Sequence, residues 1–122
     1  MIGDFMTFYN MHGAAIAFLE NETIYLFSGE PVAYFDNDAV FGFNGKHLGW
    51  IEDGWVRDLN GGCIFFTENA HGSGPVIPVK QVKPVKGVKH IKPVKSVRQV
   101  KRIKSIKSIG WSVLSGVQFF RQ

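Results

Sequence analysis

Ten basic residues recur at every third position in the second half of this sequence. Lys and Arg in such a row are the side chains that bind the phosphate groups of lipids or nucleic acids. The row contains no aromatic residue for base stacking before Trp111, which makes lipid the stronger candidate of the two. Neutralisation of acidic groups within the chain is an open structural alternative. The candidate ligands of anionic lipid or phosphate are Lys80, Lys83, Lys86, Lys89, Lys92, Lys95, Arg98, Lys101, Lys104 and Lys107.

Four acidic residues in the first half recur at intervals of sixteen, namely Glu20, Asp36, Glu52 and Glu68. If the repeats close on themselves, these carboxylates form a ring that could bind a cation or hold the basic row. The alternative is that they are solvated turn residues. A general acid–base pair needs two carboxylates in different environments, so that their pKa values separate. Repeat symmetry makes these environments alike, so we expect no catalytic residue among them.

Other chemistry-bearing residues show no pattern typical of an enzyme. The four histidines lack the spacing of metal ligands, and the sequence contains neither a nucleophile-elbow motif nor a phosphate-binding GxxxxGK[ST] loop. The single Cys63 excludes an internal disulfide, and we interpret it as a small filler residue. We therefore expect a protein that is not an enzyme and that needs no cofactor and no metal.

The charges divide the chain into two unlike segments. Residues 1–74 hold all ten acidic residues and only two basic ones, a net charge of −8, whereas residues 75–122 hold twelve basic residues and no acidic one. The N-terminus has no basic region typical of a signal peptide, and the longest fully apolar run is six residues, far below the ~20 needed to span a bilayer. We expect a cytoplasmic protein, with peripheral attachment to a membrane left open.

The acidic segment, residues 1–74, consists of a sixteen-residue repeat marked by Gly13, Gly29, Gly45 and Gly61. Each glycine follows His, Ser or Asn between runs of β-prone residues, which predicts a tight hairpin turn with positive φ at these structural glycines. Three residues after each glycine comes an aliphatic residue, and five after comes an aromatic one (Ile16, Val32, Leu48 and Ile64; Phe18, Tyr34, Trp50 and Phe66). Both columns should share the interior face, because strand side chains alternate with a period of two.

Four hairpins of this kind must share a core, because an isolated hairpin is marginally stable. Closure around one axis also removes the free strand edges. We therefore predict an all-β fold in which four hairpins close into a small barrel with pseudo-four-fold symmetry. An open stack of hairpins is the alternative.

The basic segment has a period of three residues. From Val76 to Ile109 every third residue is Val or Ile, and the residue after most of them is Lys or Arg. A period of three is typical of polyproline II, which Pro78, Pro84 and Pro93 also favour. We predict that residues 75–110 form an extended tail that docks on the β domain with Val and Ile buried and Lys outward. The apolar residues 111–122 would anchor its end.

These features together resemble the bacterial 4-fold beta flower family over nearly the whole chain. The resemblance rests on the four x-Gly hairpins, the segment from Gly45 to Trp50, the pair Arg57-Asp58 and the triplet tail that ends at Ile109-Gly110-Trp111-Ser112. It implies a small four-fold pseudosymmetric barrel with hairpin petals. A fold-level likeness of that family to Tubby-type barrels would imply association with lipid or membrane.

From the residues and the resemblance we predict a non-enzymatic binding or scaffold module that associates peripherally with anionic lipid through the basic tail. The alternative is a self-assembling structural protein, a homo-oligomer whose tails pack between subunits. A nucleic-acid binder is a weaker alternative.

Overall fold

The computed structural model describes residues 5–114 and 116–122. Each strand pairs antiparallel with the next, and Tyr9 of the first strand pairs with Phe66 of the last, which closes the sheet into a barrel. The predicted all-β, closed barrel of hairpins is therefore confirmed. The elements are β1 (Phe5–Tyr9), β2 (Ala15–Glu20), β3 (Thr23–Leu26), β4 (Pro31–Asp36), β5 (Ala39–Gly42), β6 (His47–Glu52), β7 (Trp55–Asp58), β8 (Cys63–Phe66) and the short helix α1 (Val117–Phe120).

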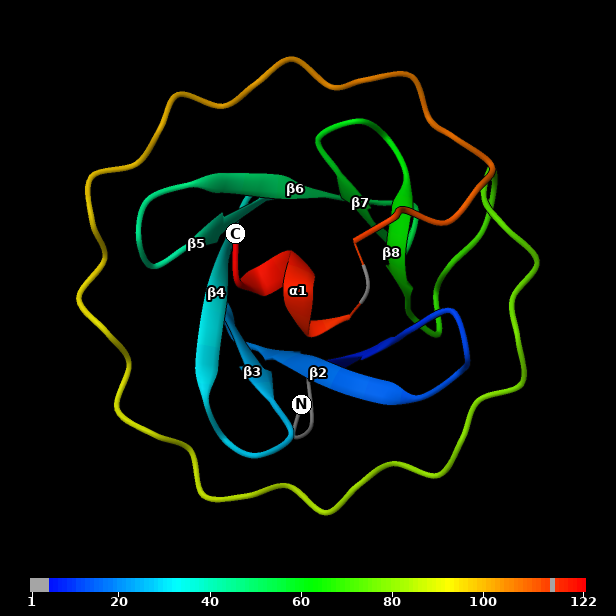
Figure 1. Ribbon diagram of the computed structural model, residues 1–122. Helices are drawn as coiled ribbons and strands as arrows, with labels where there is room; N and C mark the ends of the chain where they lie inside the picture. Colours follow the sequence, from blue (N-terminus) through cyan, green and yellow to red (C-terminus); the bar gives the residue numbers. More distant parts are fainter. Residues whose placement is uncertain (1–4, 115) are drawn as a thin grey trace.

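Four hairpins, which we call petals, surround the barrel axis (Figure 1). The petals are β1–β2, β3–β4, β5–β6 and β7–β8, and each carries one repeat glycine in its turn. The φ angles of Gly13, Gly29, Gly45 and Gly61 are 81, 104, 89 and 91°. The expectation of positive φ at all four turn glycines is therefore confirmed, and it explains why glycine recurs there.

A β-bulge interrupts every petal at the same repeat position. The register shifts at Tyr9, Tyr25, Phe41 and Arg57, which lie sixteen residues apart. The extra residue on the partner strand belongs to the aliphatic column: Leu48, for example, is skipped between the pairs Phe41–His47 and Val40–Gly49. A bulge breaks the alternation of side chains along a strand. The residue two positions after the bulged one therefore faces the other side of the sheet.

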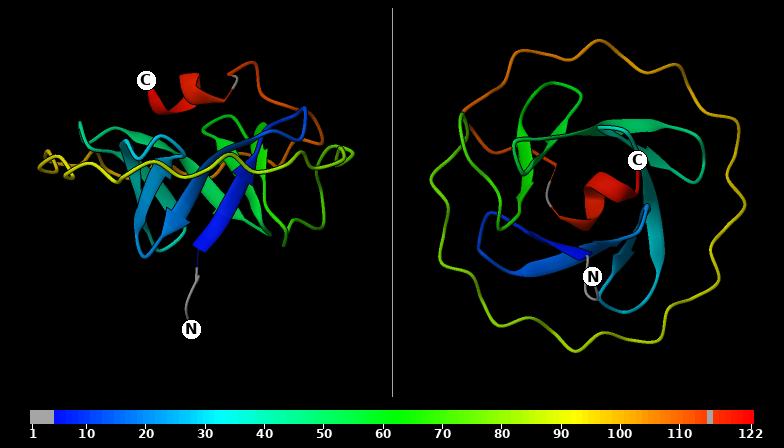
Figure 2. Two further views of the ribbon diagram at one scale, coloured as in Figure 1. Left: turned by 90° about the horizontal axis from the view of Figure 1, so that it is seen from below. Right: turned by 180° about the vertical axis from the view of Figure 1, so that it is seen from behind.

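The prediction that both columns share the interior face is consequently wrong for the aromatic column. Val32, Leu48 and Ile64 are buried in the central core. The aromatic residues are equally buried but belong to two separate clusters on the outer side of the sheet. At one end of the barrel, α1 places Phe119 and Phe120 against Phe65, with ring centroids 6.2 and 5.5 Å apart (Figures 1 and 2).

Residues 75–110, which we call the belt, run around the outside of all four petals and return to β8 (Figure 1). The belt contains neither helix nor strand. Seen from the side, it lies around the waist of the barrel rather than over either end (Figure 2). The acidic segment thus forms the inner part of the molecule, and residues 75–110 of the basic segment form the outer part.

Candidate functional site

Hydrogen bonds from the belt backbone to the petal turns hold the belt in place. The N–H groups of Gln81, His90, Gln99 and Ser108 donate to the carbonyl oxygens of Gly13, Gly29, Gly45 and Gly61 at 2.8, 2.9, 2.8 and 3.1 Å. The donors are nine residues apart and the acceptors sixteen. Three triplets of the belt therefore span one petal.

The turn glycines are also needed for space. A Cβ atom on Gly29 would lie 2.0 Å from the carbonyl oxygen of Val88, and Gly13, Gly45 and Gly61 meet Val79, Val97 and Ile106 in the same way. Such distances lie far inside van der Waals contact, so any side chain there would displace the belt. The hairpin turns were predictable from sequence, whereas this contact between distant segments was not.

The basic side chains of the belt point inward onto the aromatic residues of the petals. Lys86, Lys95 and Lys104 place Nζ 4.3, 4.2 and 5.1 Å from the ring centroids of Phe18, Tyr34 and Trp50. A second set, Lys80, Lys89 and Arg98, covers Tyr9, Tyr25 and Phe41 at 5.6, 5.4 and 4.9 Å. These are cation–π distances. The prediction of an outward Lys stripe is therefore wrong: the stems of Lys and Arg cover the aromatic rings.

The repeat acids meet the inward basic residues. Glu20 binds Lys89, Asp36 binds Arg98 at 2.5 Å, Glu52 binds Lys104 at 3.0 Å, and Glu68 lies 3.8 Å from Lys83. The hydrogen bond from Arg98 lowers the pKa of the Asp36 carboxyl. Of the readings left open for these acids, the structure thus supports the one in which they hold the basic tail.

Further ion pairs hold the later part of the belt to the petals. Lys104 also binds Asp38, Lys107 binds Asp53 at 2.9 Å, and Lys101 lies 3.8 Å from Asp36. Hydrogen bonds from Lys104 and Lys107 lower the pKa values of Asp38 and Asp53, respectively. Because these side chains are partly exposed, each pair contributes little alone. Their number still offsets much of the charge of the belt.

Arg57 joins the segment just before the belt to the end of the belt. Its buried guanidinium donates to the carbonyl oxygens of Gly61 at 2.7 Å, of Ser108 at 2.8 Å, and of Ser73. In the other petals the same repeat position holds Tyr9, Tyr25 or Phe41. In the sequence Arg57 stood out only through the family resemblance; the break in an otherwise aromatic column is the signal that identifies it.

A second break in the repeat lies at His47, where the other copies carry Ala15, Pro31 and Cys63. The Nδ1 atom of His47 accepts a hydrogen bond from the backbone N–H of Arg102 at 3.0 Å, and Nε2 lies 3.0 Å from the carbonyl oxygen of Gly49. This pattern requires a neutral ring that carries its proton on Nε2. Burial lowers the pKa of His47, which favours the same form.

Comparison with known proteins agrees with this architecture. The family model of the 4-fold beta flower protein matches residues 6–120. This chain belongs to the 4-fold beta flower family. No curated protein and no solved structure shows significant similarity to it.

The belt of this beta flower turns its aliphatic residues to solvent. We call Val76, Val79, Val82, Val85, Val88, Ile91, Val94, Val97, Val100, Ile103, Ile106 and Ile109 the rim. Their exposed fractions run from 75% at Ile109 to 96% at Ile91 and Val97. The prediction of a buried Val/Ile stripe is therefore wrong, because the inner side of the belt is occupied by the Lys and Arg stems and by the backbone contacts to the turns.

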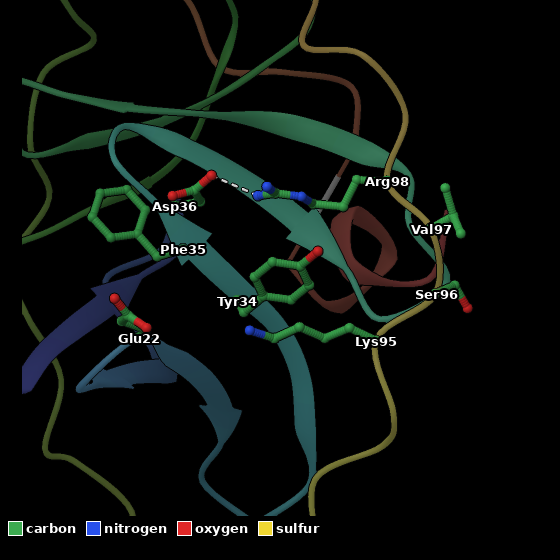
Figure 3. Close-up of a pocket in the computed structure, with 8 residues that line it drawn as sticks. All are labelled: Glu22, Tyr34, Phe35, Asp36, Lys95, Ser96, Val97 and Arg98. Atoms are coloured by element: carbon green, nitrogen blue, oxygen red, sulfur yellow. Dashed lines mark hydrogen bonds and ion pairs between the residues drawn. The ribbon is translucent and has the colours of Figure 1, made fainter.

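Two neighbouring pockets open between the belt and the β3–β4 petal of the beta flower. The larger has a volume of about 450 Å³, and Figure 3 shows Lys95 and Arg98 reaching into it from the belt while Val97 points away. The smaller, about 210 Å³, is lined by Glu20, Glu22, Lys89, Lys92 and Lys95 among others. Lys95 and Glu22 therefore line both pockets.

The described part of the beta flower contains no group of three or more His, Cys, Asp or Glu side chains able to hold a metal ion. Cys63 is buried, and burial raises the pKa of its thiol to about 11. Within residues 5–114 and 116–122, no helix is long and apolar enough to cross a membrane.

Proposed function

We propose that this beta flower protein is a non-enzymatic binding module that attaches peripherally to anionic lipid surfaces by the rim of its belt. The observation that carries the proposal is the rim itself, a regularly spaced ring of Val and Ile side chains of which all but Ile109 are at least 87% exposed. Exposed aliphatic residues scattered singly need no explanation, but an apolar surface of this extent is typical of an interaction site.

Charge favours an anionic surface over a neutral one. The whole chain carries a net charge of +4, and its basic residues lie directly inside the rim. A Lys or Arg held near an anionic membrane contributes up to about 1 kcal/mol. Nucleic acid is less well supported, since the aromatic rings that could stack on bases lie beneath the basic side chains of the belt.

The depth of attachment is limited by the belt backbone. Within the described chain, no Val or Ile N–H group between residues 76 and 109 donates a hydrogen bond. In the hydrocarbon core these groups would lose their water without gaining a partner, which costs several kcal/mol each. The rim therefore suits the headgroup level of a membrane, where its backbone stays hydrated.

Curvature limits how many rim residues touch a flat surface. The 34 residues from Val76 to Ile109 would span roughly 105 Å at a rise of ~3.1 Å, which corresponds to a circle of about 17 Å radius. Three consecutive rim residues then lie within about 3 Å of a tangent plane. Their complete burial would contribute about 4–5 kcal/mol, and shallow contact contributes less. We expect weak, salt-sensitive recruitment.

Cosedimentation with vesicles tests the proposal. The protein should bind phosphatidylcholine vesicles that contain phosphatidylglycerol, fail to bind pure phosphatidylcholine, and be released by roughly 0.5 M salt as charges are screened. Replacing the ten rim residues from Val79 to Ile106 with Thr should abolish binding and leave the fold intact. Val113→Thr is the matched control, because Val113 is 97% exposed but lies outside the belt. Absence of binding to either vesicle would refute the proposal.

Self-association through the rim is the second candidate function, and the same exposed rim favours it. Two convex rims touch over a small area, so one contact would be weak, and only several contacts around each molecule would give a stable assembly. Mass measurement in solution at two concentrations separates the cases. Assembly would be supported if the mass of the wild-type protein rises with concentration while the variant with Thr at the rim keeps the mass of a monomer.

A further inference from the structure

The rim looks alike all around the belt, but the charges beneath it do not. We compare two edges of equal length: edge A, residues 88–95, and edge B, residues 100–107. The rim residues of edge A are Val88, Ile91 and Val94, exposed by 87, 96 and 92%, and those of edge B are Val100, Ile103 and Ile106, exposed by 90, 94 and 92%. The two edges therefore offer nearly the same apolar contact, edge B having one Ile more in place of a Val.

Three of the four basic residues of edge B are engaged in ion pairs. Lys101 pairs with Asp36, Lys104 with both Asp38 and Glu52, and Lys107 with Asp53. Arg102 forms no ion pair within the described residues, so four basic side chains on this edge face four carboxylates, one of which Arg98 also binds. A membrane phosphate near this edge would compete with carboxylates that are already in place. Edge B is apolar on its outer side, and on its inner side the carboxylates match the basic residues in number, whereas edge A has three Lys residues and two carboxylates.

The basic residues of edge A are only partly engaged. Lys89 pairs with Glu20, but neither Lys92 nor Lys95 forms an ion pair within the described residues. Lys95 lies over the ring of Tyr34, and an aromatic ring does not neutralise an ammonium group. The remaining carboxylate here is Glu22, which lines both pockets and forms no ion pair among the described residues. Edge A therefore keeps a cationic surplus.

The two pockets described above adjoin the same edge. Lys92 and Lys95 line the smaller one, and Lys95 and Arg98 line the larger. The side chains of Lys92 and Lys95 therefore border open space rather than close-packed neighbours. Glu20 and Glu22 line the smaller pocket as well, so a phosphate is expected at its mouth beside the rim rather than deep inside.

We infer that edge A is the side of the protein that meets an anionic bilayer, with Val88, Ile91 and Val94 entering the headgroup layer and Lys92 and Lys95 contacting lipid phosphates. The inference rests on the proposed function and adds the orientation. The edges are twelve residues apart, roughly 37 Å along the belt at the rise of polyproline II. On a belt of this curvature, a flat membrane cannot meet both at once.

Matched variants test the orientation. V88T/I91T/V94T on edge A and V100T/I103T/I106T on edge B remove the same number of equally exposed aliphatic groups, so neither loses internal packing. In cosedimentation with vesicles of phosphatidylcholine and phosphatidylglycerol, the edge A variant should bind roughly tenfold more weakly, while the edge B variant binds like wild type. Thermal unfolding of both variants checks that the fold is unchanged.

Two charge variants make the test independent of the apolar contact. K92Q/K95Q should also weaken binding roughly tenfold, since up to two lipid contacts are lost. Glu22→Gln should strengthen it, because this change removes the unpaired carboxylate of edge A. If the two Thr variants bind equally weakly, or if K92Q/K95Q binds like wild type, the inference is wrong although the proposed function stands. If the wild-type protein fails to bind, both the inference and the proposed function are wrong.

Discussion

Gly29→Ala should destabilise the protein through the belt as well as through its own turn. The φ of Gly29 is 104°, and a left-handed conformation costs an alanine about 1–2 kcal/mol. The new Cβ would also lie 2.0 Å from the carbonyl oxygen of Val88, a backbone atom, so the belt has to move. That movement weakens the hydrogen bonds from His90 to Gly29 and from Gly87 to Phe27, at about 1 kcal/mol each.

The expected total is about 3–4 kcal/mol, a fall in melting temperature on the order of 10 °C for a chain of this size. Gly72→Ala is the control, because Gly72 has a φ of 74° but its nearest neighbour would be Asp53 Oδ2 at 3.6 Å. It should lose only the conformational part, about 1–2 kcal/mol.

Thermal unfolding measures both variants, and limited trypsin digestion reports on the belt. Gly29→Ala should speed cleavage at the belt lysines, whereas Gly72→Ala should not. Equal losses of stability in the two variants, with equal rates of cleavage, would refute the idea that the turn glycines are needed for belt docking.

Two further predictions concern the breaks in the repeat. Burial lowers the pKa of His47 from 6.5, so the unfolded chain takes up the proton first, and the free energy of unfolding should fall as pH drops below about 6.5. Urea unfolding between pH 7.5 and pH 5 measures this dependence on pH, which should be weaker in His47→Ala. A dependence unchanged in the variant would contradict the assignment to His47. Arg57→Met should lower the free energy of unfolding by about 3 kcal/mol or more, since three carbonyl oxygens lose a charged donor. Arg57→Lys, which keeps the charge but not the fork of donors, should be intermediate in the same urea titration, and wild-type stability in both variants would exclude a role in closing the belt.

The barrel could be predicted from sequence because its determinants are local. A turn glycine every sixteen residues, flanked by β-prone runs, specifies four hairpins whatever surrounds them. The side of the sheet to which each strand residue points was harder to predict. The bulge at Leu48 and its counterparts is a matter of hydrogen-bond register between two strands, and no residue type marks it, so strict alternation placed Trp50 on the wrong side.

The tail has the opposite orientation to the one predicted, because the match of charge between tail and barrel outweighs the burial of Val and Ile. Burying Val and Ile is favourable in isolation, but a surface of net charge −8 covered with aromatic rings is better matched by Lys and Arg. Their stems cover the rings, as Lys95 does with Tyr34, while their ends reach the carboxylates, as Lys104 does with Glu52. The division of charge between the two segments was visible in the sequence and was the better guide.

Nine residues of the belt correspond to one petal of sixteen residues, and this correspondence couples the number of petals to the length of the belt. The period of three decides which side chains of the belt face inward, and the period of nine decides which triplet of the belt meets which hairpin turn. Loss of a single triplet would keep every Lys inward yet move the donors after it onto the wrong carbonyl groups. A fifth petal would require nine additional belt residues before Ser73 and Ser108 could again meet at Arg57. Duplication of a hairpin is therefore viable in this family only when the belt lengthens by three triplets in the same step.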